Sequence, residues 1–193
     1  KPISVPMVFS GFNPAAVKLF ENTFRQKGLI PVMGGGGSIQ TEETENIPRI
    51  DEHTLEPGSA VGAQLIRGDF NMAGTGTVTY RNDKTILAFG HPYLWSGALN
   101  IPMTQADIIT VIPDQASSTK IGNVTKVVGA VLWDHTNGLY GKLGDTAQMI
   151  PVEIAFHVGN QLVNTYQFDV MMSTAWTPTL VNMGVANTIL GNG

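Results

Sequence analysis

The amino-acid sequence predicts a mostly-β domain with one helix near its beginning and a short helix at its end. From Leu55 onward, short runs rich in Val, Ile, Thr and aromatic residues alternate with turn residues at close intervals, as in a β-barrel or β-sandwich. Before that point, apolar side chains recur at helical spacing within residues 13–27. The chain has 193 residues, of which 42% are hydrophobic, enough to fill a core.

The first helix has clear signals at both ends. Asn13 is a favourable N-cap, and Pro14 after it suits the first helical position. Gly28 closes the segment as a C-terminal cap. Apolar runs on either side predict strands at residues 3–9 and 29–33.

The remaining strands follow one another between turns. Asn82-Asp83 and Gly159-Asn160 are hairpin signals, and Gly74 and Gly76 indicate a bulge or a close backbone approach. A terminal helix is expected over residues 179–190, with Thr177 as its cap. The expected strands are residues 60–67, 70–73, 75–81, 84–89, 106–112, 120–133, 138–142, 148–158 and 161–171.

Changes in composition divide the chain into three parts. Residues 1–33 form a strand-helix-strand element, residues 34–54 a glycine-rich and acidic linker, and residues 55–193 the β domain. The glycine run that opens the linker could cradle a phosphate, but no Lys-Ser or Lys-Thr follows it as in a P-loop. The abrupt ends of the chain indicate a segment of a longer precursor.

Composition excludes several classes of function. Charged residues are only 13% of the chain and the net charge is −4, with no basic cluster for nucleic acid. The absence of cysteine excludes disulfides and thiolate chemistry. No metal or cofactor is expected, since no zinc motif or calcium loop occurs. No apolar run is long enough to span a bilayer.

Five short motifs follow one another between residues 55 and 155. They are Leu55–Gly62 (LEPGSAVG), Gly76–Tyr80 (GTVTY), Ala88–His91 (AFGH), Val128–Ala130 (VGA) with Asn137–Leu143 (NGLYGKL), and Met149–Val152 (MIPV). Their order and spacing resemble those of the SpoIVB-type serine peptidase domain, a family of sporulation-protease-like proteins. The resemblance covers about half of the chain and leaves residues 1–50 unmatched.

This resemblance implies a chymotrypsin-like β-barrel, an extracytoplasmic location and serine endopeptidase chemistry, with His91 as the general base. By chain order, Ser173 would be the nucleophile and Asp134 the acid that orients the histidine. The family's nucleophile lies in a GMSGSP motif, whereas Met171–Ala175 of this chain reads MMSTA. The glycines of that motif let consecutive amides converge on an oxyanion. Without them, the chain is expected to be inactive by itself.

His91 therefore has three interpretations: general base, structural residue of its turn, or part of a non-catalytic binding site. No motif singles out the serine or the acid. The other serines considered are Ser59, Ser96, Ser117 and Ser118, and the other acids are Asp107 and Asp114.

Two functions follow from these observations. The first is a SpoIVB-like peptidase domain that is a fragment or a divergent member of its family. The second is a non-catalytic binding or structural module in an extracellular or cell-envelope assembly, which binds a protein or peptide or associates with copies of itself. The low charge, the many Asn and Thr residues and the abrupt ends favour the second for this chain, whereas the resemblance favours the first.

Overall fold

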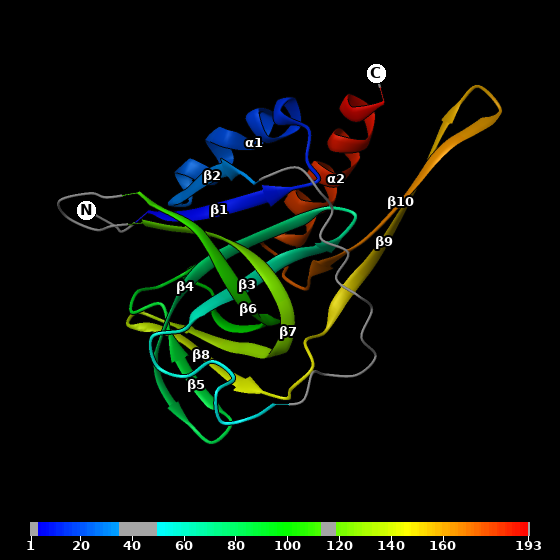
Figure 1. Ribbon diagram of the computed structural model, residues 1–193. Coiled ribbons are helices and arrows are strands. Elements are labelled where there is room, and N and C mark those ends of the chain that lie inside the picture. Colours follow the sequence, from blue (N-terminus) through cyan, green and yellow to red (C-terminus); the bar gives the residue numbers. More distant parts are fainter. Residues whose placement is uncertain (1–3, 35–49, 113–118, 193) are drawn as a thin grey trace.

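The computed structural model describes residues 4–34, 50–112 and 119–192 (Figure 1). Its strands form one ten-stranded sheet, accompanied by one helix near each end of the chain. The predicted mostly-β class with two terminal helices is therefore confirmed. Most of the expected linker, residues 35–49, lies outside the described residues.

Strands and helices succeed one another along the chain in a simple order. In sequence they are β1 (Val5–Ser10), α1 (Pro14–Gln26), β2 (Leu29–Met33), β3 (Ala60–Gly68), β4 (Asn71–Asn82), β5 (Thr85–Ala88), β6 (Gly97–Ile112), β7 (Thr119–His135), β8 (Gly138–Leu143), β9 (Met149–Val158), β10 (Gln161–Met171) and α2 (Thr177–Gly191).

Six of the strands pair in a closed cycle, which we call the six-strand ring. Its order is β3-β4-β5-β8-β7-β6, and β6 pairs again with β3, every pairing being antiparallel. β3, β4 and β5 are consecutive neighbours, and β6 returns to lie beside β3, which is the Greek-key connection. β7 and β8 then run back and forth and close the ring against β5. The loop from β5 to β6 contains the predicted histidine turn.

The N-terminal unit extends the same sheet. β1 and β2 are parallel and are joined through α1, as parallel strands require a crossover. The side chain of Asn13 accepts a hydrogen bond from the Ala15 amide, and Gly28 has a φ of +79° after the helix, so both predicted helix ends are confirmed. β1 pairs with the beginning of β4, which joins residues 5–33 to the ring.

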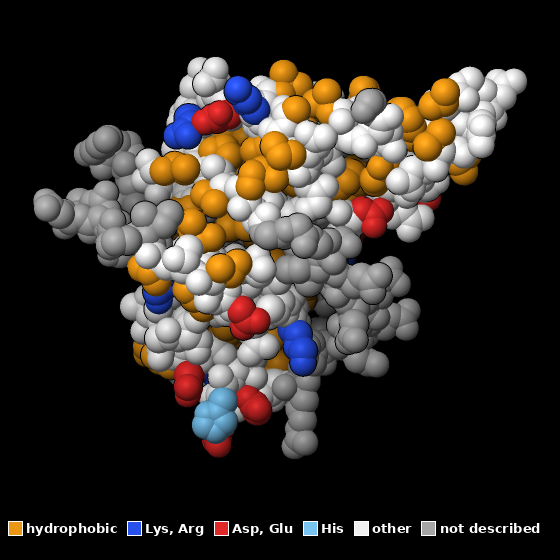
Figure 2. All heavy atoms as spheres, turned by 45° about the horizontal axis from the view of Figure 1, so that its top comes forward, with side chains coloured by type: hydrophobic (Ala, Val, Ile, Leu, Met, Phe, Trp, Pro, Cys, Tyr) orange, Lys and Arg blue, Asp and Glu red, His pale blue; other side chains and the backbone are white. Residues whose placement is uncertain are grey.

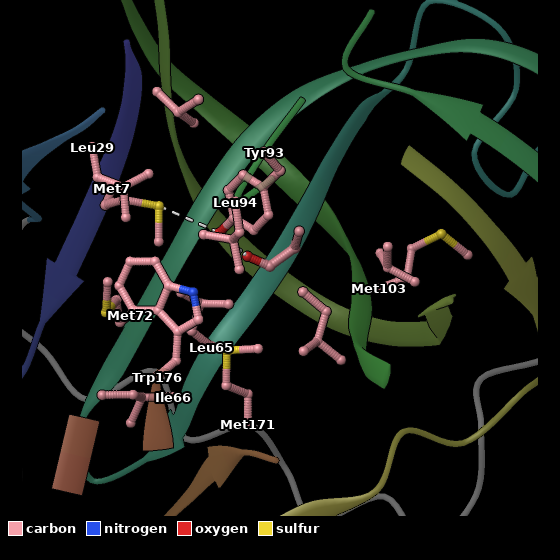
Figure 3. Close-up of a cluster of buried hydrophobic side chains, with 14 of the residues drawn as sticks. Met7, Leu29, Leu65, Ile66, Met72, Tyr93, Leu94, Met103, Met171 and Trp176 are labelled. Atoms are coloured by element: carbon pink, nitrogen blue, oxygen red, sulfur yellow. Dashed lines mark hydrogen bonds between the residues drawn. The ribbon is translucent and has the colours of Figure 1, made fainter. Parts of the chain in front are cut away.

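The core is continuous between the ring and the N-terminal unit. Tyr93, from the loop after β5, is 1% exposed and reaches between three strands (Figure 3). Its ring lies against Gly74, where an added Cβ would be 2.5 Å from Tyr93 Cε2. A Cβ added at Gly76 would likewise lie 2.5 Å from the ring of Phe89. A bulge or a close backbone approach was expected at these two glycines, whereas the groups that approach them are aromatic side chains.

The β9–β10 hairpin leaves the body as an arm (Figure 1). At its base Phe168 packs on Phe70. From Tyr166 towards its tip the arm is largely exposed, and the exposed side chains there include Val158 and Leu162. Figure 2 shows hydrophobic side chains gathered over the helical side of the molecule and onto this arm. No helix among the described residues is long and apolar enough to cross a membrane.

Three local predictions need correction. Residues 70–73 and 75–81 belong to one strand, β4, because Gly74 continues the pairing with β3. β6 begins at Gly97 and not at residue 106, with irregular pairing that accommodates Pro102. Thr177 is not the cap of α2: the N-cap is Trp176, and the Thr177 hydroxyl bonds the backbone of Ser173 and Met171.

We expect Gly74→Ala to lower the free energy of unfolding by about 1–3 kcal/mol, because the new methyl group overlaps the Tyr93 ring. Urea denaturation measures this loss. Gly191→Ala is the matched control, because no atom lies within 4 Å of the Cβ it adds. Equal stabilities of the two variants would contradict this packing.

Candidate functional site

The histidine turn begins where β5 ends. Phe89 and Gly90 both have positive φ, +72° and +70°, which reverses the chain away from the strand. The Phe89 amide donates to the Thr77 carbonyl at 3.0 Å, and its ring occupies the space that Gly76 leaves open. The β7–β8 turn packs on the other side, since a Cβ at Gly138 would lie 3.2 Å from the Gly90 amide. The turn is therefore held by a backbone hydrogen bond and by close packing at two glycines.

The His91 ring is hydrogen-bonded to the backbone of its own turn. Nδ1 lies 2.8 Å from the Pro92 carbonyl oxygen, and because a carbonyl can only accept, Nδ1 carries the proton. In a serine protease triad the orienting carboxylate receives that Nδ1 proton. In this turn the backbone of the next residue takes that role, and Nε2 is the nitrogen left to accept. The His91 and Phe89 rings form a T-shaped pair, with centroids 5.9 Å apart.

Asp134 supports the loop that follows the turn. Its carboxylate is 5% exposed and accepts hydrogen bonds from the amides of Tyr93, Leu94 and Ser96 at 2.8, 2.7 and 3.1 Å. Hydrogen bonds between ionised and neutral groups are among the stronger ones in proteins. Asp134 therefore holds residues 93–96 in a tight arc around its side chain.

Tyr93 fixes the same loop to the sheet. Its hydroxyl donates to the Ala63 carbonyl at 2.8 Å and accepts from the Gly74 amide at 3.0 Å. The Met7 sulfur lies 3.3 Å from this oxygen, as the dashed line in Figure 3 marks. Burial of the phenol raises the pKa of Tyr93 far above its ordinary value. One side chain thus joins the loop to β1, β3 and β4.

The outer side of this loop presents Trp95 to solvent. Its side chain is 64% exposed, and its φ is +57°, a region that bulky residues rarely adopt. Strained backbone of this kind costs about 1–3 kcal/mol and persists where the surroundings impose it, often at binding sites. The anchors at Asp134 and Tyr93 impose it on this loop.

An open groove of about 870 Å³ lies beside Trp95, within the usual range for ligand sites. Three parts of the chain form its walls. They are residues 93–96 with Ala98 and Leu99, residues 172–176 before α2, and the end of α1 at residues 25–28 with Ser4 and Val5. We call this feature the groove.

The structure separates the three predicted catalytic residues. Ser173 lines the groove, and its carbonyl accepts from the amides of Trp176 and Thr177 as part of the turn into α2. Neither His91 nor Asp134 lines the groove. Within the described residues, no hydrogen bond joins any two of the three. The arrangement does not assemble a triad, and their catalytic roles stay predictions.

The other candidates add no alternative site. Ser59 directly precedes β3, and its backbone bonds Val78 and Glu56. Asp107 is exposed on β6. Across residues 4–34, 50–112 and 119–192, no three His, Asp or Glu side chains are grouped to hold a metal ion. Ser117, Ser118 and Asp114 lie outside the described residues.

Sequence reasoning did not identify the groove. Its one visible signal was the Tyr93-Leu94-Trp95 run, since large apolar side chains in a predicted loop indicate either burial or a binding surface. Both occur: Tyr93 and Leu94 are buried, and Trp95 is exposed. The contribution of α1 to the groove depends on long-range packing.

Comparisons of the chain with protein-family models, with curated proteins and with solved structures find no match.

Replacing Asp134 with Ala should lower the free energy of unfolding by about 3 kcal/mol, because the buried amides of Tyr93 and Leu94 lose their acceptor. The midpoint of urea unfolding measures the effect. Asp107→Ala, on an exposed strand position, is the control and should match the wild type. A small effect of Asp134→Ala would mean that the carboxylate does not hold the loop.

Tyr93 should make the protein less stable in alkali. Because its pKa is raised above the ordinary 10.0, its contribution to stability is complete below pH 10 and decreases as the pH rises further. Tyr93→Phe lacks this group, so its unfolding midpoint in urea should fall less steeply above pH 10 than that of the wild type. Equal slopes would show that the phenol is not buried.

Proposed function

We propose that the chain is a divergent, non-catalytic member of the SpoIVB-type peptidase family that binds a protein or peptide segment in the groove. The five ordered motifs between residues 55 and 155 support the kinship. The closed Greek-key ring, with the histidine turn between β5 and β6, also supports the kinship, because closed antiparallel sheets are the basis of barrels.

Loss of catalysis is supported by the bonding of the polar groups. Three loop amides occupy the Asp134 carboxylate, and the Pro92 carbonyl holds Nδ1 of His91, the nitrogen that an orienting acid would bind. Ser173 lacks the glycines that let amides converge on an oxyanion. Among the described residues, Ser173 is hydrogen-bonded to neither His91 nor Asp134, and a nucleophile without a base in contact loses nearly all triad function. This bonding is the observation that carries the proposal.

Binding is supported by the shape and lining of the groove. It is open, of suitable volume, and has Trp95 and Met172 exposed beside hydroxyl side chains. Exposed aromatic side chains on a preformed loop are common anchors for protein partners. A site outside the cytoplasm agrees with a surface that is poor in charge, and we propose an envelope or extracellular assembly as the setting.

Removing Trp95 should weaken peptide binding by about tenfold or more, because large aromatic anchors carry much of the energy of such interfaces. Fluorescence polarisation with degenerate pools of labelled short peptides measures the affinity. Trp133→Ala is the matched control, since Trp133 is also exposed but does not line the groove. His91→Ala should likewise bind as the wild type does.

Equal losses for Trp95→Ala and Trp133→Ala would contradict binding at the groove. A fluorophosphonate probe tests the catalytic alternative, because it labels only an activated serine. We expect no labelling. Labelling of Ser173 that disappears in His91→Ala would establish a peptidase and overturn the proposal.

A further inference from the structure

The groove differs in charge from the rest of the chain. The sequence holds 15 acidic and 11 basic residues, yet among the described residues the groove lining includes Arg25 and Lys27 and no Asp or Glu. An acidic protein thus carries a locally positive groove. This contrast favours a ligand of negative charge.

Lys27 is the cation best placed to meet such a ligand. Its ammonium lies 4.7 Å from the centroid of the Trp176 ring, a cation–π contact. Trp176 is 4% exposed and stacks on Phe24 at 6.4 Å, so the ring that positions the ammonium is itself fixed. In the part of the chain that the structure describes, no carboxylate forms an ion pair with Lys27.

Arg25 contributes less positive charge. Its guanidinium forms an ion pair with Glu21 at 2.7 Å, one helical turn earlier. That bond neutralises part of its charge and orients it along α1. The net attraction of this wall therefore depends mainly on one ammonium group.

The facing walls supply apolar contacts and hydroxyls. Trp95 and Met172 are 64% and 57% exposed, and Ser96, Ser173 and Thr174 lie among them. A ligand that contacts Lys27 on one wall and Trp95 and Met172 on the other two needs a carboxylate near an apolar side chain. A polyphosphate fits poorly, because it calls for grouped cations, whereas the described lining of this groove offers one cation outside an ion pair.

Extending the proposed function, on which this step depends, we propose that the groove selects acidic peptide segments. A ligand carboxylate pairs with Lys27, and a neighbouring aromatic or aliphatic side chain lies against Trp95 and Met172. The occupant is a segment of a partner protein in which Asp or Glu stands beside a large apolar residue.

The test compares three pools of labelled short peptides that share the same randomised apolar positions. The remaining positions are Asp and Glu in the first pool, Ser and Gln in the second, and Lys and Arg in the third. We expect the acidic pool to bind about tenfold more tightly than the neutral one, as a charge-assisted bond predicts. Higher salt should reduce this preference.

Variants of Lys27 locate the preference. Lys27→Ala should lose the tenfold selectivity, Lys27→Glu should reverse it, and Lys27→Arg should retain it. Lys18→Glu, on the helix that Lys27 caps but outside the groove lining, is the matched control for net charge. Circular dichroism confirms that each variant is folded.

The possible results separate this inference from the proposed function. If all pools bind equally and Lys27→Glu has no effect while Trp95→Ala weakens binding, acidic selectivity is wrong and binding in the groove stands. If no pool binds, the proposed function fails and the selectivity fails with it. If Lys18→Glu loses as much selectivity as Lys27→Glu, the effect comes from net charge and the proposed contact is wrong.

Discussion

The architecture of the candidate site depends on the buried carboxylate of Asp134. A charged group that is 5% exposed must be compensated by hydrogen bonds, and the compensation comes from three amides of the loop between β5 and β6. The loop must curve around the carboxylate to bring these amides together. That curvature turns Tyr93 and Leu94 inward and leaves Trp95 outward with a positive φ. The wall of the groove that carries Trp95 is thus shaped by the hydrogen bonds of one buried carboxylate.

Local sequence signals were sufficient for most strands and for the first helix. Residues 29–33 and 161–171 were predicted with the bounds that the structure has, because each lies between strong turn residues. The first half of β6 was missed because Pro102 interrupts the strand pattern, and its pairing is irregular there. The closure of the ring depends on β5 meeting β8 and β6 meeting β3. Pairings so distant in sequence leave no local signal.

The candidate site was harder to predict. The histidine turn was identified correctly as a feature, since Gly90 and Pro92 mark it. What the ring bonds to could not be read from neighbours, and a backbone carbonyl holds its Nδ1. Asp134 in a Trp-Asp-His run looks the same in sequence whether it orients an imidazole or binds amides. The groups that meet its carboxylate decide between these roles, and they depend on how β6 pairs with β7.

Amide hydrogen exchange followed by NMR tests the central claim most directly. The account predicts that the amide protons of Tyr93, Leu94 and Ser96 exchange slowly, as donors bonded to a buried carboxylate. The contradicting result is exchange of all three as fast as in an unstructured chain, together with a His91 Nδ1 proton shifted downfield as in an imidazole–carboxylate bond. Asp134 would then serve the histidine.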